Sequence, residues 1–571
     1  MRKWILCLFF WIFFPVEAAY LPPVLSQDGM VVTDHYLASQ VGADILRQGG
    51  NAMDAAVAVA YALAVVDPCC GNIGGGGFML VHWHTGEDIM LDFRETAPKN
   101  IRPALFFHRD GKIKSSSELG YLPVGIPGTV MGLNTALKKY GTFSLQRVMA
   151  PAIKLAEQGF ILNSGDIAIY QHEPTLTMTA AARRLFMPNG QFVKPGQRLT
   201  QKDLAVTLKK ISEQGEAVFY RGEIARQIVA SSAKNQGVIS LDDLKNYRVV
   251  WRKPIFCKYR GYQVITSPPP SSGVIICEIL QIVEKFPLSK WGYGAALGLN
   301  YNINAMDYAF RDRDRYLGDP AFVNNPIDML LSPQHIQKLQ ALIQQNKKIK
   351  SNMPVQDPAS HTTHFVVMDR AGNVISTTYT INSLFGIKEM AGNTGFFLNN
   401  ELGDFTLRVG QLNQFRLLQG PTNLIAPNKR PLSSMSPTIV MHNGKIFMAL
   451  GAAGGSTIIT SITEALENVI DYGMNIAGAV NSPRYHTQYY PDKVFMEPFV
   501  FSPDTMNLLI RWGHPLQAKL FGQFEYWGQI AAILVDPNGI INGENDNRRP
   551  NGAAIGLTPV VKKIGGAGFL Q

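Results

Sequence analysis

The pattern of apolar and polar residues changes character along the chain. Residues 20 to about 350 alternate helical stretches with loops. Within this part, residues 55–66 form an Ala-rich apolar run that follows Asn51, a good helix N-cap, with Asp54 three residues further on. The run is too short to cross a bilayer, so it predicts a buried helix.

After His361 the pattern becomes that of β-structure. Residues 362–369 and 373–380 are rich in β-branched and apolar side chains and flank a three-residue loop that ends in Gly372. This predicts a hairpin with Gly372 in the left-handed conformation. In that register Asp369 faces Asn373, and Thr362 lies opposite Thr380, close enough for one hydroxyl to bond the other.

A second hairpin is predicted further along the chain. Residues 435–442 and 445–450 flank Asn443-Gly444, a strong type I′ turn signal. The pairing expected from this turn sets Ser433 opposite Gly454. It therefore gathers four small residues at one end of the sheet, just before a helix predicted from Ser456 to about Asp471: Ser433, Ser434, Gly454 and Gly455.

Three further segments have recognisable patterns. Residues 267–273 hold three consecutive prolines and predict a rigid loop, because proline cannot donate to a strand ladder. Residues 332–348 predict a polar helix. The stretch 351–361 that follows has the accessible, irregular character of a processing loop.

Composition excludes several classes of protein. With 571 residues, the chain is long enough for two or three domains or one large α/β body. Hydrophobic residues make up 46% and charged residues 17%, a normal globular balance, and the net charge is +10. The densest basic run, Arg311, Arg313 and Arg315, alternates with acids, which predicts paired charges on a solvated helix face. We therefore expect no nucleic-acid partner.

The first residues predict an export signal. Arg2 and Lys3 precede the eleven-residue apolar run 4–14, and small residues follow at 16–18. We expect a signal peptide over 1–18 and a periplasmic or secreted mature chain. An uncleaved membrane anchor is the alternative.

Export implies an oxidising compartment, where four cysteines remain after signal removal. They include no CxxC and no Cys/His metal spacing. A disulfide between Cys257 and Cys277 and a pair of buried free thiols both remain open.

A threonine becomes a strong nucleophile only with a base beside it. At a chain N-terminus the base is the residue's own α-amine, whose ordinary pKa of about 7.7 to 8.0 suits proton transfer near neutral pH. Such an enzyme must be cut immediately before its nucleophile. Thr362, at the junction between the irregular stretch and the first predicted strand, meets this requirement of position, but a Thr-Thr pair that only fills the start of a strand has the same pattern. Both interpretations remain open from the residues alone.

The motifs around this threonine resemble those of the γ-glutamyltransferase family, over about residues 27–552. The matching segments are 49–55, 74–78, 92–95, 362–364, 399–401, 427–437 and 454–456. The resemblance implies that Thr362 is the nucleophile in cleavage after His361 and in turnover. It implies that Thr380 hydrogen-bonds Thr362, and that the N–H groups of Gly454 and Gly455 stabilise the oxyanion.

The resemblance also implies a site for the glutamyl head group. Arg94 matches a residue that binds its carboxylate, and a guanidinium fork suits that group. Ser433 and Ser434 match residues that hydrogen-bond the same carboxylate. Three residues match those that hold the ammonium: Asn382, Glu401 and Asp404. Residues 407–419, with Phe415, match a lid found in some members.

The implied fold is an α+β, four-layer αββα sandwich of the N-terminal-nucleophile type. A large fragment, 19–361, and a small one, 362–571, would form it together as a heterodimer. The implied reaction moves a γ-glutamyl group from glutathione or similar amides to water or to an amino-acid or peptide amine. No cofactor or metal is expected, because His361 and His364 lack a third ligand.

Two other functions remain open. A β-lactam (glutaryl or cephalosporin) acylase shares the nucleophile, but its glutaryl substrate has no ammonium for Glu401 and Asp404 to meet. A non-catalytic exported binding protein on the same fold would need none of Thr362, Thr380 and Arg94.

Overall fold

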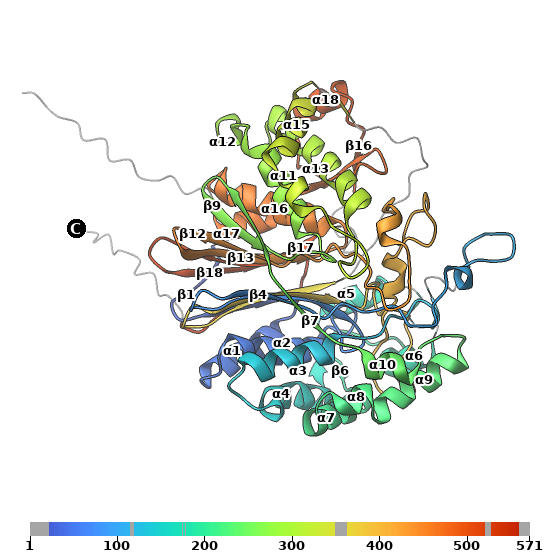
Figure 1. The fold of residues 1–571 in the computed structure, drawn as a ribbon. Helices are drawn as coiled ribbons and strands as arrows, with labels where there is room; N and C mark the ends of the chain where they lie inside the picture. Colours follow the sequence, from blue (N-terminus) through green and yellow to red (C-terminus); the bar gives the residue numbers. More distant parts are fainter. Residues whose placement is uncertain are drawn as a thin grey trace, which may run out of the picture.

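The computed structural model describes residues 22–114, 119–173, 175–176, 179–345, 347–348, 362–519 and 527–558. In this part of the chain, two seven-stranded sheets lie face to face, with helices against both outer faces (Figure 1). The predicted four-layer αββα sandwich is therefore confirmed. The predicted signal peptide, 1–18, and the predicted processing loop, 351–361, lie outside the described residues.

Both sheets combine strands from before residue 345 with strands from after residue 362. The order of the first sheet is β19-β2-β10-β11-β3-β4-β7. Its strands are β2 (Met30–Thr33), β3 (Gly76–His82), β4 (Asp88–Asp92), β7 (Val250–Arg252), β10 (Thr363–Met368), β11 (Val374–Thr380) and β19 (Ala553–Gly556). The order of the second is β1-β18-β17-β13-β12-β9-β8. Its strands are β1 (Val24–Ser26), β8 (Ile255–Tyr259), β9 (Tyr262–Thr266), β12 (Thr438–His442), β13 (Lys445–Ala453), β17 (Gln529–Val535) and β18 (Ile541–Asn545).

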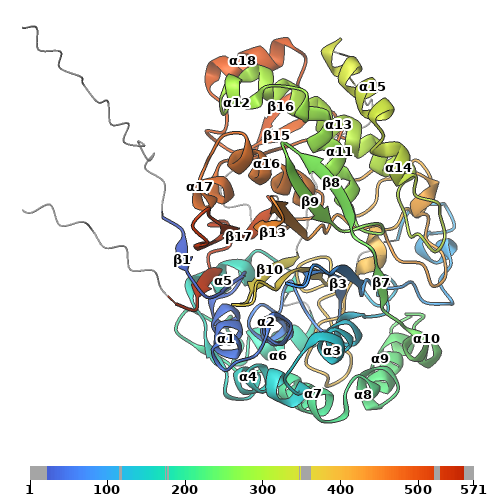
Figure 2. The same ribbon diagram turned by 60° about the vertical axis from the view of Figure 1, so that its left-hand side comes forward.

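The two helical layers come from different parts of the chain (Figure 2). Against the first sheet lie α1 (Tyr36–Arg47), α2 (Ala52–Val66), α3 (Thr129–Tyr140), α4 (Leu145–Gln158), α6 (Ala180–Phe186), α7 (Lys202–Gln214), α8 (Ala217–Tyr220), α9 (Glu223–Lys234) and α10 (Leu241–Asn246). Against the second lie α11 (Gly273–Glu284), α12 (Leu288–Trp291), α13 (Ala296–Tyr316), α15 (Pro333–Gln344), α16 (Thr457–Ile470), α17 (Ile476–Asn481) and α18 (Pro503–Arg511). Smaller elements are α5 (Ser164–Gln171), α14 (Ile327–Leu330), the sheet of β14 (Tyr485–His486), β15 (Val494–Met496) and β16 (Leu516–Ala518), and the pair β5 (Phe160–Ile161) and β6 (Arg198–Leu199).

Helix α2 confirms the buried helix predicted from the apolar run. Asn51 accepts from the N–H of Asp54, and the Asp54 carboxylate accepts from the N–H of Asn51, which completes a capping box. Every residue of α2 is buried, and the helix packs against β10 and β11. The strand that follows Thr362 therefore packs against a fully buried, apolar helix.

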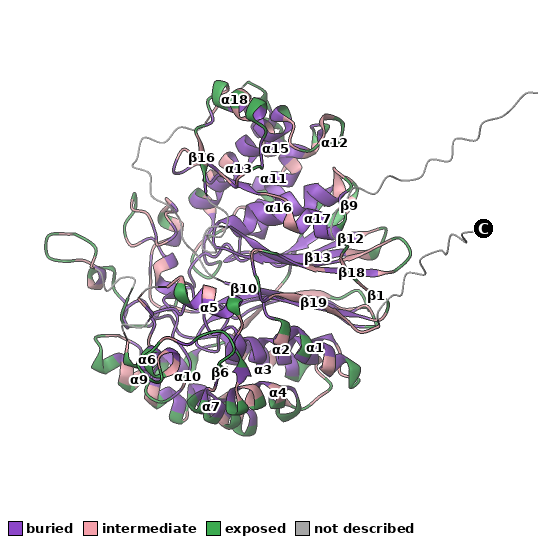
Figure 3. Cartoon of the chain, turned by 180° about the vertical axis from the view of Figure 1, so that it is seen from behind, coloured by how far each residue is buried: buried purple, intermediate pink, exposed green. Residues whose placement is uncertain are grey.

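The strands alternate between two cores because successive side chains point to opposite faces of a sheet. In β10, Phe365 and Val367 join the core beside α2, whereas Val366 and Met368 join the core between the sheets. The inner faces of all four layers are buried, and the exposed residues lie on the outer helices and loops (Figure 3).

The first predicted hairpin is confirmed in its register. β10 and β11 pair with Thr363 opposite Tyr379 and Met368 opposite Val374. Asp369 donates its N–H to the carbonyl of Asn373 at 3.1 Å, and Gly372 has a φ of 88°. This pairing leads Thr362 toward Thr380 at the end of the ladder.

The register of the second predicted hairpin is right only near its turn. His442 pairs with Lys445, but a β-bulge between Val440 and Met441 shifts the pairing, so Thr438 lies opposite Leu450. The expected Ser433–Gly454 pairing is therefore wrong by one residue, and β12 begins only at Thr438. A bulge adds one residue to one strand, which a turn signal alone does not reveal. The helix that follows, α16, is confirmed.

Two predictions about helices before residue 350 need correction. The polar helix predicted over 332–348 ends earlier, since α15 spans Pro333–Gln344. The pairs Arg311–Asp312 and Arg313–Asp314 form on α13, as predicted, at 2.9 and 3.2 Å. However, Arg313 is only 1% exposed, so this helix face is not solvated there. Arg313 instead contacts Ser272 and Ser434, which come from two other segments of the chain.

The structure decides between the alternatives left open for the cysteines. Cys257 and Cys277 form a disulfide that ties β8 to α11. Cys69 and Cys70 form a second disulfide, which the sequence did not predict. No helix within the described ranges combines the length and apolarity that a membrane crossing requires.

Candidate active site

The predicted site residues converge on one pocket at an end of the sandwich. The described residues of its wall are Arg94, Arg313, Thr362, Thr380, Asn382, Glu401, Asp404, Asn413, Phe415, Leu417, Leu432, Ser433, Ser434, Met435, Gly455 and Ile458. Nine of the ten residues predicted for catalysis or binding are among them. Gly454 adjoins the pocket through Gly455, and His361 lies outside the described residues.

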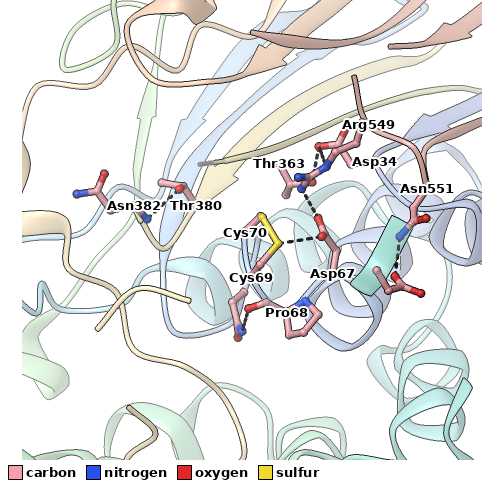
Figure 4. The surroundings of a disulfide bond; sticks show 12 residues. Asp34, Asp67, Pro68, Cys69, Cys70, Thr363, Thr380, Asn382, Arg549 and Asn551 are labelled. Atoms are coloured by element: carbon pink, nitrogen blue, oxygen red, sulfur yellow. Dashed lines mark hydrogen bonds and ion pairs between the residues drawn. A yellow bond between two sulfur atoms is a disulfide. The ribbon is translucent and has the colours of Figure 1, made fainter. Parts of the chain in front are cut away.

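Thr362 lies at the pocket, and the strand that follows it is fixed by hydrogen bonds to Asp34. Asp34 accepts hydrogen bonds from the Thr363 hydroxyl at 2.9 Å and from the His364 N–H at 3.1 Å. Burial raises the pKa of Asp34 to about 6, and the nearby guanidinium of Arg549 opposes the rise. Arg549 in turn pairs with Asp67 at 2.8 Å (Figure 4). Sequence reasoning missed this group, which comes from three distant segments.

The end of β11 is held from the same side. The carbonyl of Cys70 accepts from the N–H of Ile381 at 3.1 Å, and that of Cys69 from the N–H of Phe385 at 2.8 Å. Figure 4 shows the disulfide close to Thr380 and Asn382. The Cys69–Cys70 unit therefore positions the segment that carries both residues.

Close approach of the backbone requires glycine beside this segment. A Cβ on Gly75 would lie 1.8 Å from the carbonyl oxygen of Thr380. The Gly-rich stretch before β3 therefore packs directly against the segment that carries Thr380.

Hydrogen bonds in the turn after β11 fix the positions of Thr380 and Asn382. The Thr380 hydroxyl oxygen accepts the N–H of Asn382 at 2.9 Å, a bond that takes up one of its lone pairs. Asn382 has a φ of 79°, a left-handed conformation that asparagine tolerates better than most residues. Its side-chain nitrogen donates to the Asn400 carbonyl at 3.1 Å. The turn after β11 thus sets both residues at the pocket wall.

Gly454 and Gly455 form the turn between β13 and α16. Their φ values of 128° and 57° are in the region that favours glycine. The N–H groups of Thr457 and Ile458 bond back to the carbonyls of these two glycines. The turn places the glycine N–H groups at the positive end of the α16 dipole, where an oxyanion would be stabilised.

Arg94 is completely buried and forms ion pairs with two carboxylates, Glu401 and Asp404. The two acids belong to a 3₁₀ helix, η4 (Glu401–Asp404), in which side chains three residues apart eclipse each other. This explains how two acids of one short element hold the same guanidinium. Glu95 adds a third carboxylate at 3.5 Å.

Burial dominates the electrostatics of this group. It raises the pKa of Glu401 well above its ordinary value and also raises that of Asp404, while Arg94 opposes both shifts. The pKa of Glu95 rises to about 7, again because of burial. The acids raise the pKa of the Arg94 guanidinium, so it stays charged. The pocket therefore holds the fixed positive charge of Arg94 among buried carboxyl groups. A second cation beside these groups would stabilise their charged form.

Ser433, the first of the two predicted serines, is oriented by hydrogen bonds to its neighbours. The N–H of Ser433 donates to the Pro270 carbonyl at 2.7 Å, so the proline loop is a wall behind the site. The Ser433 oxygen accepts the N–H of Met435 at 3.1 Å. Its proton is therefore not used in that bond.

The segment predicted to be a lid contributes three residues to the pocket wall: Asn413, Phe415 and Leu417. The side-chain oxygen of Asn413 accepts from the N–H groups of Phe415 and Leu417, at 2.9 and 3.0 Å. Its nitrogen donates to the Asp404 carbonyl at 3.1 Å. Phe415 is buried and contributes to the wall. The loop is thus fixed to the element that carries the acids.

Arg313 is a wall residue that sequence reasoning placed on a solvated face. A cation inside an alternating Arg–Asp run has the same pattern whether the helix is exposed or covered, so no local signal marked it.

Comparison with known proteins agrees with this arrangement. The family model described as Gamma-glutamyltranspeptidase matches residues 38–556. The chain is 46% identical over 561 residues to a glutathione hydrolase proenzyme of Pseudomonas sp. (strain A14), covering 95% of this chain and 96% of that one. It is 43% identical to the Escherichia coli (strain K12) proenzyme of the same description, covering 93% and 92%. A solved cephalosporin acylase from Bacillus halodurans has a TM-score of 0.83 at 28% identity, covering 95% and 99%.

Proposed function

The chain belongs to the γ-glutamyltranspeptidase family, and we propose that it is an autoprocessing glutathione hydrolase and γ-glutamyltransferase whose nucleophile is Thr362. One observation carries the assignment of the site. Thr362 shares a pocket with a buried arginine and two buried carboxylates, the groups that a zwitterionic head group requires.

The first reaction cuts the chain before Thr362. Its hydroxyl oxygen attacks the carbonyl carbon of His361, the peptide C–N bond breaks, and the freed amine takes a proton. Water then opens the resulting ester. The products are the fragments 19–361 and 362–571, which would remain together as a heterodimer because both sheets interleave strands from the two parts.

The second reaction transfers the γ-glutamyl group. The freed amine of Thr362 accepts the proton of its own hydroxyl, which attacks the γ-carbonyl of the donor. The donor's amine leaves with that proton, and a γ-glutamyl ester remains on Thr362. Water or an amino-acid or peptide amine then attacks this ester. Gly454 and Gly455 would stabilise the oxyanion, and Thr380 would donate to the nucleophile.

Donor binding would replace the internal ion pairs of Arg94 by pairs with the two charged groups of the substrate. Without substrate, Arg94 is held by Glu401 and Asp404. A glutamyl head group brings an ammonium for the acids, together with Asn382, and a carboxylate for Arg94, Ser433 and Ser434. Both buried signs of charge then remain paired, which low-dielectric surroundings require.

The same exchange argues against an acylase of glutaryl side chains. A glutaryl group offers a carboxylate and no ammonium, so it would take Arg94 from the acids and leave two buried carboxylates without a cation. The chain is also less similar to the solved cephalosporin acylase, at 28% identity, than to the glutathione hydrolase proenzyme at 46%.

We also propose that the mature enzyme is periplasmic or secreted. The signal-like residues 1–18 support export, and two disulfides are typical of oxidising compartments.

The purified protein tests the proposal directly. We expect two bands on a denaturing gel, a small fragment whose first residue is Thr362, and turnover of a γ-glutamyl anilide that rises with a dipeptide acceptor. Thr362→Ala should give one uncut, inactive chain. A small fragment that begins at another residue, or an active Thr362→Ala protein, would contradict the assignment of the nucleophile.

A further inference from the structure

A second arginine, Arg313, lies in the pocket wall beside Arg94. It comes from the last turn of α13 and is 1% exposed. It forms an ion pair with its neighbour Asp314 at 3.2 Å. Asp314 is not part of the pocket wall, so a head group in the pocket brings no cation that could replace Arg313 as the partner of Asp314. Arg313 is therefore poorly placed to be the ion partner of a substrate. Its other contacts indicate a different role.

The guanidinium fork of Arg313 spans two serines from separate segments. Its Nε donates to the Ser272 hydroxyl at 2.9 Å, and its Nη2 donates to the Ser434 hydroxyl at 3.2 Å. A guanidinium has no acceptor, so both serine oxygens must accept. Each serine therefore keeps its own proton for another partner.

The two protons lead to the predicted carboxylate site. Ser272 donates its proton to the backbone carbonyl of Ser433 at 2.6 Å, which fixes the segment of the two pocket serines. In the described part of the chain, the Ser434 hydroxyl has no acceptor, although Ser434 lines the pocket. Its proton is available to an anion in the pocket.

We propose that Arg313 is a positioning residue that orients the Ser434 hydroxyl as a donor to the α-carboxylate of the substrate, fixes the Ser433 segment through Ser272, and so sets the enzyme's requirement for that carboxylate. This rests on the proposed function of the pocket. Arg313 does not touch the substrate in this proposal. It acts through its two donated hydrogen bonds, which make both serine oxygens acceptors and leave each hydroxyl proton to be donated elsewhere.

Lysine could not replace arginine in this role. Its single ammonium keeps the positive charge but cannot bridge Ser272 and Ser434 with a rigid fork. Arg313→Lys therefore tests the bridging hydrogen bonds to the two serines while the positive charge at this position is kept. Arg311→Lys is the matched control, because Arg311 pairs with Asp312 on the same helix and is not part of the pocket wall.

The experiment compares two p-nitroanilide donors, γ-glutamyl and 4-aminobutyryl, which differ only in the α-carboxylate. In Arg313→Lys we expect kcat/KM for the γ-glutamyl donor to fall about 10- to 100-fold, mainly through KM, because hydrogen bonds to a charged group are lost. The kcat/KM for the 4-aminobutyryl donor should change by less than about 3-fold. This donor has no α-carboxylate, so it makes no hydrogen bond that depends on Arg313. Arg311→Lys should resemble the wild type for both donors.

A double-mutant cycle identifies the path of the effect. If Arg313 acts through Ser434, then Arg313→Lys should cost clearly less in a Ser434→Ala background than in the wild type. Equal losses for both donors, or full additivity with Ser434→Ala, would overturn the proposal and leave Arg313 a purely structural residue.

Two further measurements keep the result interpretable. If Arg313→Lys fails to fold or to process, Ser272→Ala keeps the arginine and removes one arm of the fork. It should raise KM for the γ-glutamyl donor alone, and equal effects on both donors would contradict the proposal. Wild-type protein without γ-glutamyl turnover would instead contradict the proposed function itself.

Discussion

Two buried arginines have similar surroundings and different positions in the fold. Arg94 is held by Glu401 and Asp404, and Arg549 lies between Asp67, at 2.8 Å, and Asp34, at 3.8 Å. Each is a cation between two buried carboxylates. The chain therefore uses the same arrangement twice within one sandwich.

The difference between the two groups is access to the pocket. Arg94 and its acids form part of the pocket wall, whereas Arg549, Asp34 and Asp67 do not. Arg549 instead joins the end of β2 to the end of α2, and Asp34 holds the strand after Thr362. An ion triad that faces a cavity can exchange partners with a ligand, whereas the closed triad supports the strand that follows Thr362.

The largest effect is expected from breaking the closed triad. Arg549→Met leaves Asp34 and Asp67 buried without their cation, which should cost about 3–5 kcal/mol of stability. Thermal unfolding should detect this as a lower midpoint and a smaller yield of processed protein. In the fraction that folds, KM for the donor should stay near the wild-type value. A changed KM at unchanged stability would reverse the roles assigned to the two triads.

Breaking the open triad should affect binding. Arg94→Ala should lower kcat/KM for γ-glutamyl anilide about 100-fold or more, because two charge-assisted hydrogen bonds to the donor are lost. Self-cleavage should still occur, which a denaturing gel shows. Arg94→Lys is the matched variant and should recover part of the loss. Wild-type kinetics in Arg94→Ala would rule out this pocket assignment.

The two disulfides allow a second contrast between site and scaffold. The paired replacement of Cys69 and Cys70 by serine should lower kcat about 3- to 10-fold, because the segment 380–385 loses its fixed support and the geometry loosens. The same change at Cys257 and Cys277, remote from the pocket, should lower the unfolding midpoint and leave kcat unchanged. Equal kinetics for both double variants would remove the positional role of the Cys69–Cys70 unit.

The smallest effect concerns pH and lies outside both triads. His335 contacts Glu278 at 3.1 Å and Asp312 at 2.9 Å, and these hydrogen bonds raise its pKa to about 9. Because the pKa of His335 is higher in the folded state, its contribution to stability is complete below about pH 6.5 and is lost as pH rises toward 9.

We therefore expect the unfolding midpoint to fall between pH 6.5 and 9, and to fall less steeply in His335→Gln. Burial also raises the pKa of Glu278, to about 8, which adds to the fall in the same direction. Parallel curves for the wild type and His335→Gln would contradict the assignment of this dependence to His335.

Local signals account for much of the fold. The capping residues and apolar run of α2, the β10–β11 hairpin and the start of α16 are all set by neighbours in sequence, and all three were predicted. The second hairpin was predicted at its turn and failed beyond the bulge at Val440 and Met441. A register depends on every residue between the turn and the position of interest, so one inserted residue changes it.

The sequence by itself determined the elements, the candidate nucleophile and, through family resemblance, the identity of most pocket residues. Only the tertiary structure decided that Arg94 is held by Glu401 and Asp404, that Asp34 supports Thr363, and that Arg313 is buried against two serines. The physical reason is sequence distance. A turn or a cap is decided by residues within hydrogen-bond reach along the chain, whereas the partner of a buried charge is decided by which distant segments the sandwich packs around it.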